Sequence, residues 1–392
     1  MAPSDEARVI EEARELVSVP TVNPPGGEAE LVEYLVDRFE ASPVEFDIET
    51  QRIHPDDPDR QNVVARAGDP TRGTLLLTGH IDVVPATEAE WSVPPFELTR
   101  RGDRLVGRGI ADMKGPLAGM LLGVESYFAS TDAPGEVILA FVGDEEAGGR
   151  GTRELVRQGI DADAAILGEP TNLTVGRANK GALRYDVTVR GESVHSGRPD
   201  QGTNAASAVP GIVGRLEALD DEMATHTHEL LVPSSTVTVT RISCGTAPNI
   251  VPGEVTITFD WRFLPGMSSD PEWYDRKVEE AITGITIEDE PVDPVIDRWN
   301  FKPAADIAAD EPVVGALEAA LDGIGSDIEH TGFNAGTDAG YLSGAEIPTV
   351  LFGPGSIEGQ AHTVDESIDV AELTASVGAY EGAIEAFFET GG

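Results

Sequence analysis

The chain has 392 residues, and its 70 acidic against 27 basic residues give a formal net charge of −43. Such a charge repels nucleic acids and anionic membranes, and no apolar stretch reaches the roughly 20 residues that a membrane-spanning helix needs. A single cysteine, Cys244, excludes intrachain disulfides and cysteine-rich zinc sites.

The acidic residues are spread along the whole chain and are not collected in a tail. Spread acidity with little lysine is typical of proteins that work in very salty cytoplasm, where ions screen self-repulsion. The N-terminal segment has an acidic amphipathic pattern, without the basic start and short apolar core of a secretory signal. We therefore expect a halophilic, cytoplasmic protein, with an ordinary acidic protein as the alternative.

The first 170 residues alternate helical and strand-like patterns. Helices are predicted at the N-terminus, at 28–41 and at 114–130, and short apolar strands include TLLLTGHID, VILAFVG and AAILGEP. This alternation is typical of a parallel sheet that helices cover on both faces. We predict an α/β fold whose sheet is mixed and largely parallel.

The pattern changes between residues 180 and 292. Longer strands with period-2 alternation, LRYDVTVRG, STVTVTRIS and EVTITFDWRF, surround a predicted helix at 204–223, and GITIEDE is a candidate fourth strand. Strict alternation is typical of antiparallel sheets with one wet face. After a proline-rich passage, α/β character returns with helices at 312–322 and 370–389. We therefore predict a catalytic domain in two parts, 1–179 and 293–392, interrupted by an α+β domain at 180–292.

Several apolar strands run into side chains that can bind metal ions or move protons. These side chains are His80 and Asp82, Glu145 and Glu146, Glu169, and His362 in the loop after TVLFGPG, while Asp112 precedes a helix in GRGIADMKG. In open α/β sheets, sites form beyond the carboxyl ends of strands, so these side chains can converge. Each acid taken alone is also consistent with an ordinary solvated turn in so acidic a chain.

The chemistry of this set favours a metal site. Imidazole and carboxylate ligands without sulfur suit Zn²⁺, Co²⁺ or Mn²⁺ rather than Ca²⁺. Five ligands suit two ions that share a bridging carboxylate, at a separation of roughly 3.5–4 Å. Adjacent side chains at a strand end point in different directions, so one of Glu145 and Glu146 can bind metal while the other faces substrate.

The segments TGHIDVVP, GRGIADMKG, VGDEEAGGRGT, LGEPT and GQAHTVDES, in this order, resemble the metal-binding segments of the M20 metallopeptidases. That family includes acetylornithine deacetylases, succinyl-diaminopimelate desuccinylases, aminoacylases and glutamate carboxypeptidases. KGALRYDVTVRG, VHSGRPDQGTNA and APNIVPGEVTITFDWR resemble its lid or dimerisation domain. The likeness covers nearly the whole chain and implies the fold of the dinuclear-zinc exopeptidases.

The resemblance also implies roles in the catalytic domain. His80 and Glu169 bind one ion, Glu146 and His362 bind the other, Asp112 bridges both, Asp82 orients a ligand histidine, and Glu145 is the general base. Glu145 would take a proton from a metal-activated water and pass it to the leaving amine.

Further roles are implied for the inserted domain and a nearby loop. His195 would stabilise the oxyanion of the intermediate. In this family that histidine often reaches the active site of the partner subunit, so a homodimer is implied. Arg262 and Asn249 match residues that hold the substrate carboxylate or backbone. Gly336 and Thr337 match a loop that contacts substrate.

The leading functional hypothesis is a dinuclear metal hydrolase that cleaves the amide bond of an N-acyl amino acid, of the deacetylase or desuccinylase type. The alternatives are a dipeptidase or glutamate-carboxypeptidase-like exopeptidase and, in another class, a non-catalytic metal or small-molecule binder. One departure matters for specificity: Asn179, Lys180 and Gly181 stand where bacterial desuccinylases usually have paired arginines before the glycine. Lys180 could still hold one carboxylate, without the directing fork of a guanidinium.

Overall fold

The structure is a computed structural model that describes residues 5–132 and 134–389. The chain forms two compact units, with the boundaries at Ala178/Asn179 and Ala305/Asp306. The short segment Asn334–Thr337 groups with the second unit, whereas the chain on either side of it groups with the first.

The first unit is built on a nine-stranded mixed sheet with the strand order β1-β2-β6-β3-β7-β17-β8-β15, to which β16 adds by pairing with β8. β6, β3, β7 and β17 are mutually parallel, while β1, β2 and β8 run antiparallel to their neighbours. The mixed sheet of the predicted α/β fold is confirmed, with its parallel strands at the centre. The strands are β1 (Asp47–His54), β2 (Asp57–Ala67), β3 (Asp69–His80), β6 (Gly135–Val142), β7 (Ala164–Leu167), β8 (Val175–Asn179), β15 (Ala305–Asp306), β16 (His330–Phe333) and β17 (Thr349–Leu351).

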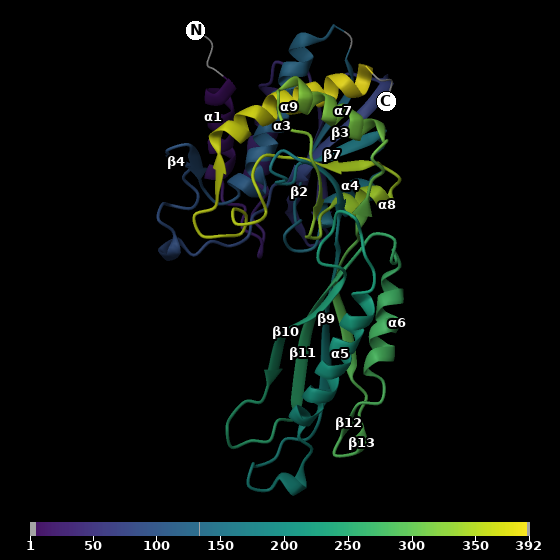
Figure 1. Cartoon of the computed structure of the whole chain (residues 1–392). Helices are drawn as coiled ribbons and strands as arrows, with labels where there is room; N and C mark the ends of the chain where they lie inside the picture. Colours follow the sequence, from purple (N-terminus) through teal and green to yellow (C-terminus); the bar gives the residue numbers. More distant parts are fainter. Residues whose placement is uncertain (1–4, 133, 390–392) are drawn as a thin grey trace. The chain divides into compact units, whose positions relative to one another are not determined.

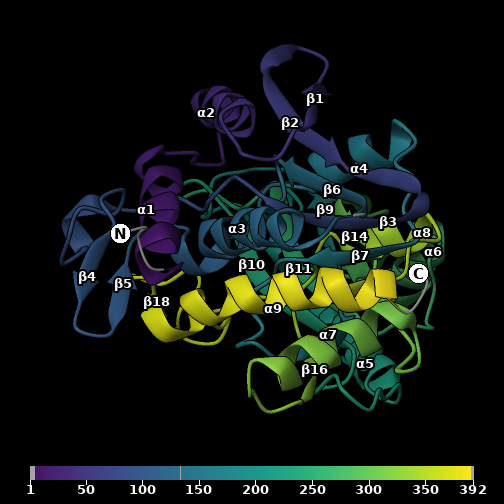
Figure 2. The same cartoon turned by 90° about the horizontal axis from the view of Figure 1, so that it is seen from above.

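Helices cover both faces of this sheet because its central strands are apolar on both sides. Leu75 and Leu77 of β3 pack into one large core, whereas Leu76 between them packs into a second, smaller core. Figure 2 shows α3, α9 and α7 lying across one face of the sheet. The helices of the large core are α1 (Asp5–Ser18), α2 (Ala29–Glu40), α3 (Gly115–Ser130), α7 (Pro312–Gly323) and α9 (Val370–Glu389), and those of the smaller core are α4 (Arg150–Arg157) and α8 (Ala339–Gly344).

A small three-stranded sheet brings two distant loops of the first unit together. It has the order β18-β5-β4, with β4 (Thr99–Arg101), β5 (Arg104–Val106) and β18 (Ser367–Asp369). Just beyond β5, the amide of Gly107 donates to the carbonyl of Glu366 over 3.0 Å. The segment that leads into the short turn η2 (Ile110–Lys114) therefore lies against the segment that follows His362. A further single turn, η1 (Glu88–Glu90), precedes β4.

Partly buried ion pairs tie the helices of the first unit to one another. Glu125 of α3 accepts hydrogen bonds from Arg38 of α2, at 2.9 Å, and from Arg8 of α1, at 3.2 Å. Arg38 also donates to Glu12 over 2.8 Å. Such pairs leave each buried charge with a partner, which is the condition for keeping charge in a protein interior.

The second unit is an antiparallel four-stranded sheet, β10-β11-β9-β14, packed on two helices. Its strands are β9 (Gly181–Arg190), β10 (Thr236–Cys244), β11 (Glu254–Phe263) and β14 (Val295–Lys302), and its helices are α5 (Val209–Met223) and α6 (Pro271–Ile282), with the short turns η3 (Pro199–Gln201) and η4 (Ala205–Ala208). Val255, Ile257 and Phe259 alternate into the core, as the period-2 pattern predicts.

The fourth strand of this sheet is not the candidate segment GITIEDE. That segment instead forms a separate hairpin from β12 (Thr286–Ile287) and β13 (Glu290–Pro291), and β14 takes the edge position by pairing with β9. Because β14 belongs to this sheet, the second unit runs on to Ala305, past the expected boundary at 292.

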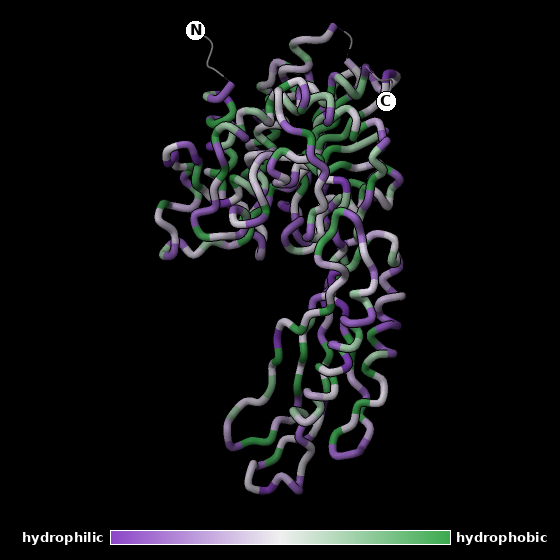
Figure 3. Tube along the Cα trace, in the orientation of Figure 1, coloured by the Kyte–Doolittle hydropathy of each residue, from purple (hydrophilic) through white to green (hydrophobic). Residues whose placement is uncertain are grey.

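Figure 3, in the orientation of Figure 1, shows the strands of the main sheet as apolar and the outer turns of the first unit as hydrophilic. Among the helices of the described residues, none combines the length and apolar character that crossing a bilayer requires.

Candidate metal centre

Three neighbouring parallel strands deliver polar side chains to one edge of the main sheet. In the register of β3 and β6, His80 pairs with Val142, and in that of β3 and β7, Thr78 pairs with Leu167. Glu145, Glu146 and Glu169 therefore follow their strands at the edge where His80 ends its own. This is the carboxyl edge at which open α/β sheets bind ligands.

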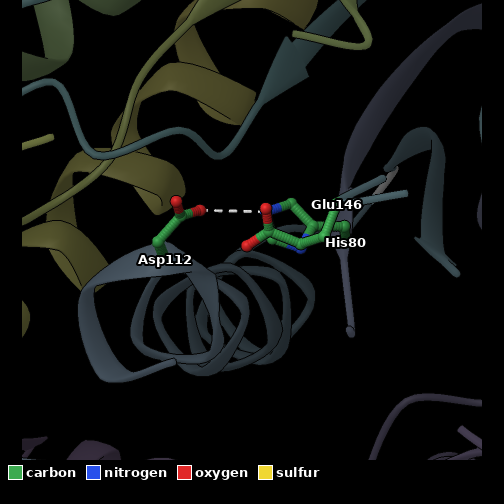
Figure 4. Close-up of side chains that lie close together, drawn as sticks. All are labelled: His80, Asp112 and Glu146. Carbon is green, nitrogen blue, oxygen red and sulfur yellow. Dashed lines mark hydrogen bonds and ion pairs between the residues drawn. The ribbon is translucent and has the colours of Figure 1, made fainter. Parts of the chain in front are cut away.

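Asp112 lies between two imidazole rings. Its Oδ1 is 2.9 Å from His80 Nε2, and its Oδ2 is 3.2 Å from His362 Nε2. His362 Nε2 is also 2.9 Å from Glu146 Oε1. Potential ligand atoms of His80, Asp112 and Glu146 all lie within 4.8 Å of one another, and Figure 4 shows the three side chains converging.

The second ring nitrogen of His80 is held by the backbone. Nδ1 lies 2.9 Å from the carbonyl oxygen of Asp82, to which it donates, while the Asp82 carboxylate is 3.7 Å away. A proton on Nδ1 leaves Nε2, which faces Asp112, as the ring atom that could bind a metal. The orientation of His80 predicted to come from Asp82 is thus provided most closely by the main chain of that residue.

The carboxylate of Asp82 organises the adjacent turn. It is fully buried, and it accepts the backbone amides of Glu145 and Glu146, each over 3.1 Å. A buried carboxylate needs several donors of this kind to offset the loss of its hydration. The side chain of Asp82 therefore fixes the position of the backbone from which the two glutamate side chains extend.

Glu366 holds the backbone of Asp112 in a similar way. Its Oε1 accepts the amides of Ala111 and Asp112 over 2.9 and 3.1 Å, and its Oε2 accepts from Arg108 over 2.6 Å. The buried pair of Glu366 and Arg108 thereby links the Asp112 turn to the loop of His362.

Burial and hydrogen bonding oppose each other in this cluster. Burial lowers the pKa of His80, but the hydrogen bond to Asp112 and the nearby carboxylate charges together outweigh it and hold that pKa well above its ordinary value. Hydrogen bonds to Asp112 and Glu146 raise the pKa of His362 to about 10. Burial raises the pKa of Asp112, yet hydrogen bonds from both histidines hold it well below its usual range, whereas burial raises the pKa of Glu146 to about 7.

This donor set fits a divalent cation. Two imidazoles and two carboxylates converge without sulfur, which is the chemistry that Zn²⁺, Co²⁺ and Mn²⁺ accept. Each ring places a nitrogen within hydrogen-bonding distance of a carboxylate, and a metal ion binds to such ligands by displacing the protons that they hold. His80, Asp112, Glu146 and His362 could therefore hold a metal.

The two remaining carboxylates of the predicted site, those of Glu145 and Glu169, are also buried. Glu145 is 7% exposed and Glu169 is 4% exposed, in a unit where most acids face water. Glu169 follows β7 and is not part of the three-residue donor group that lies within 4.8 Å among the described residues. Its assignment as a ligand stays a prediction.

The other predicted residues lie in the second unit. His195 and Asn249 are exposed on adjoining loops, where the Ser196 amide donates to the Asn249 carbonyl over 3.0 Å. The Gly197 amide donates to His195 Nδ1 over 3.0 Å, so the neutral ring carries its proton on Nε2. These contacts describe the second unit by itself.

Two cations of the second unit already have partners within it. Arg262 donates to Asp260 through Nε at 2.6 Å and Nη2 at 3.2 Å. Lys180 Nζ donates to the carbonyls of Pro233 and Ser234, at 2.5 and 3.1 Å. Burial, followed by the charge of Arg262, lowers the pKa of Lys180.

Gly336 and Thr337 belong to the segment that groups with the second unit. A Cβ at position 336 would lie 3.2 Å from the Cβ of Ala182 and 3.4 Å from that of Lys302. Thr337 is buried, with only 1% of its surface exposed. Their predicted contact with substrate is not tested by these packing contacts.

Sequence reasoning missed several residues that support the centre: Asn23, Arg60, Arg108 and Glu366. Glu366 stands four positions after His362 in GQAHTVDES, so its place in that segment was a usable signal. Arg60 and Asn23 carry no local signal, because each is separated by tens of residues from the groups that it contacts.

Comparisons with known proteins agree with this geometry. The model of the family described as peptidase family M20/M25/M40 matches residues 76–386. An acetylornithine deacetylase from Proteus mirabilis is 32% identical over 380 residues, covering 92% of each chain. Another, from Aliivibrio fischeri, is 33% identical over 308 residues, covering 78% of this chain and 79% of that one.

Solved structures share the fold at lower identity. A tripeptidase from Staphylococcus aureus has a TM-score of 0.79 at 19% identity, covering 98% of this chain and 99% of that one. An M20 family metallo-carboxypeptidase from Sulfolobus solfataricus also has a TM-score of 0.79 at 19% identity, covering 97% and 99%. At this identity the likeness establishes the fold alone.

The raised pKa of His362 leads to a prediction about metal affinity. Because the pKa of His362 is about 10, its ring is protonated at neutral pH and must lose that proton to bind metal. We expect the affinity for Zn²⁺ to rise between about pH 6 and pH 8, with net release of protons on binding. Calorimetric titrations in buffers of different ionisation enthalpy measure both quantities, and a pH-independent affinity without proton release would contradict the assignment.

Proposed function

Because the chain belongs to the peptidase family M20/M25/M40 and is an enzyme that hydrolyses amide or peptide bonds, we propose that its substrate is a small N-acyl amino acid. Acetylornithine deacetylases, matched along 92% of the chain, support this choice over a peptide substrate. Membership of a hydrolase family also argues against the alternative of a non-catalytic binding protein.

The observation that carries the proposal is the position of Asp112. One carboxylate directs its two oxygens at two different imidazoles, His80 and His362, over 2.9 and 3.2 Å. A carboxylate that bridges two metal ions uses its two oxygens in this way. We therefore propose two divalent ions, Zn²⁺ first and Co²⁺ or Mn²⁺ as alternatives, with Glu146 and Glu169 completing the ligands.

Glu145 has the features of a general base. When bound, the ions polarise the scissile carbonyl and lower the pKa of water at the site. Glu145 has its amide fixed by Asp82, and its side chain is proposed to hold a proton and deliver it to the leaving amine. His195 is proposed to donate Nε2–H to the oxyanion, because its Nδ1 already accepts a hydrogen bond from the Gly197 amide.

The second unit favours a small neutral acyl group. A succinyl group would bring a second carboxylate, which needs a cation free to receive it. Lys180 is engaged by two backbone carbonyls and Arg262 by Asp260. These contacts favour the deacetylase type over the desuccinylase type.

A free sheet edge supports the proposed homodimer. Among the described residues β10 pairs only with β11, in the order β10-β11-β9-β14, so its outer edge has backbone groups that can pair with a second chain. Ile242 on this strand is 48% exposed. We propose that two copies associate through the second unit.

A salt-rich cytoplasm is the proposed environment. The net charge of −43 creates self-repulsion that ordinary ionic strength screens only over about 8 Å, and molar salt screens over about 3 Å. The low lysine content fits the same environment, because only four of the basic residues are lysines: Lys114, Lys180, Lys277 and Lys302.

A panel of N-acyl amino acids tests the proposed substrate class. We expect turnover of N-acetyl amino acids with added Zn²⁺ or Co²⁺, and a lower kcat/KM for the matching N-succinyl compounds, because Lys180 and Arg262 are already paired. Dipeptides in the same panel serve as the comparison. Preferential cleavage of dipeptides, or of the succinyl compounds, would overturn the specificity.

Substitution of the proposed base separates catalysis from metal binding. Glu145→Ala should bind metal as the wild type does but lose about 10²–10⁴-fold in kcat, the usual contribution of a general acid–base group. Metal content and steady-state kinetics measured on one preparation check both statements. A variant that keeps its turnover would remove Glu145 from this role.

Dilution from molar to low salt tests the environment and the assembly together. We expect a folded dimer at about 2 M KCl, and loss of structure and activity at about 0.1 M, because the unscreened charges then repel one another. Circular dichroism and sedimentation velocity follow fold and mass. Full activity at low salt would contradict the halophilic proposal, and a monomer at high salt would contradict the dimer.

A further inference from the structure

A buried ionic network lies behind the turn that carries Glu145 and Glu146. Arg60, in β2, contacts Asp144 Oδ1 through Nη2 at 2.6 Å and Glu28 Oε1 through the same nitrogen at 2.7 Å. Its Nε also donates to Glu28 Oε2 over 3.2 Å. All three residues are at most 8% exposed, so these charges are removed from water and depend on one another.

Asn23 joins this network to the metal-site turn. Its Nδ2 donates to Asp82 Oδ2 over 2.8 Å and to Asp144 Oδ1 over 3.1 Å. Asp82 in turn accepts the amides of Glu145 and Glu146. The side-chain amide of Asn23 therefore donates to two buried carboxylates. Asp144 belongs to the turn itself, and Asp82 accepts the amides of the next two residues.

The backbone of this turn needs such support. Asp144 has φ of +69°, in the left-handed region that non-glycine residues rarely adopt. Its side chain points inward to Arg60, although the next two acids belong to the proposed active site. The inward anchor of Asp144 therefore determines the direction in which Glu145 and Glu146 leave the strand end.

The guanidinium of Arg60 is also enclosed from the other side. Gly26, with φ of +100°, passes so close that a Cβ there would lie 2.8 Å from Arg60 Cζ. A guanidinium fork with carboxylates on two sides and backbone over it has little freedom to move. The network is thus a rigid support for the turn.

We propose that Arg60 is a positioning residue, which through Asp144, Asn23 and Asp82 holds Glu146 in place to bind metal and Glu145 in place to transfer a proton. The proposal deepens the proposed function and depends on its metal site. The contacts of Arg60 run to Asp144 and Glu28, so its effect on the two glutamates passes through the turn.

The matched comparison is between Arg60→Met and Arg38→Met. Arg38 is also an arginine of the first unit that bridges two carboxylates, Glu12 and Glu125, but it ties helices together and has no link to the turn. Both variants remove a guanidinium from two carboxylates, so both should lower Tm. Only Arg60→Met should disturb the metal site.

Co²⁺ binding and its visible absorption spectrum provide the first readout, since neither requires substrate. We expect Arg60→Met to weaken Co²⁺ binding by about 10–100-fold, the usual effect of losing an outer partner of a metal ligand, and to alter the spectrum. The kcat for the best substrate should fall while KM stays unchanged. Arg60→Lys, which keeps the charge but not the fork, should recover part of each loss.

Asn23→Leu gives an independent test if Arg60→Met does not fold. It keeps the pairs of Arg60 with Asp144 and Glu28, but it removes the link to Asp82, so the same changes in Co²⁺ affinity and spectrum are expected. Wild-type affinity, spectrum and kcat in both variants, or equal losses in Arg38→Met, would overturn the proposal.

The outcomes also separate this proposal from the proposed function. A wild type that binds Co²⁺ but hydrolyses no N-acyl amino acid would overturn the function, while Co²⁺ affinity would still test Arg60. A wild type that binds no Co²⁺ would overturn both. An active wild type whose Arg60 variants are unaffected would overturn the role of Arg60 alone.

Discussion

The carboxylate of Asp112, held between the imidazoles of His80 and His362, is the interaction on which the rest of the site depends. The two histidines are far apart in the sequence of the first unit. One lies at the end of β3 and the other in the loop before β18. Only a group with two acceptor oxygens at fixed geometry can face both. Everything that places Asp112, above all Glu366 and the small sheet around it, therefore places the centre as a whole.

The surroundings of the centre resolve a conflict between charge and burial. Asp82, Asp144, Glu28 and Glu366 are all nearly inaccessible, and each would be expensive to bury as an isolated anion. Backbone amides, the side chain of Asn23 and the guanidinium groups of Arg60 and Arg108 donate hydrogen bonds to them. Guanidinium forks and main-chain donors have defined directions, so the same contacts that offset the charge also orient the turns.

The sequence was sufficient to select candidate site residues where local features point to them. Apolar strands that end in His80 or in Glu145 and Glu146 indicate the carboxyl edge of a parallel sheet, and the family segments identify Asp112 and His362. It was not sufficient for Asp82, whose main chain rather than its carboxylate takes His80 Nδ1. Nor did it predict β14, because pairing of an edge strand depends on which partner is left open.

The sequence by itself determined the α/β fold and the family, because strand periodicity and the family segments are contained in short stretches of sequence. Only the tertiary structure decided which buried groups support the ligands. Asn23 and Asp82 are 59 positions apart, and Arg108 and Glu366 are 258 apart. No local pattern relates such pairs, since their contact exists only after the strands and loops between them have packed.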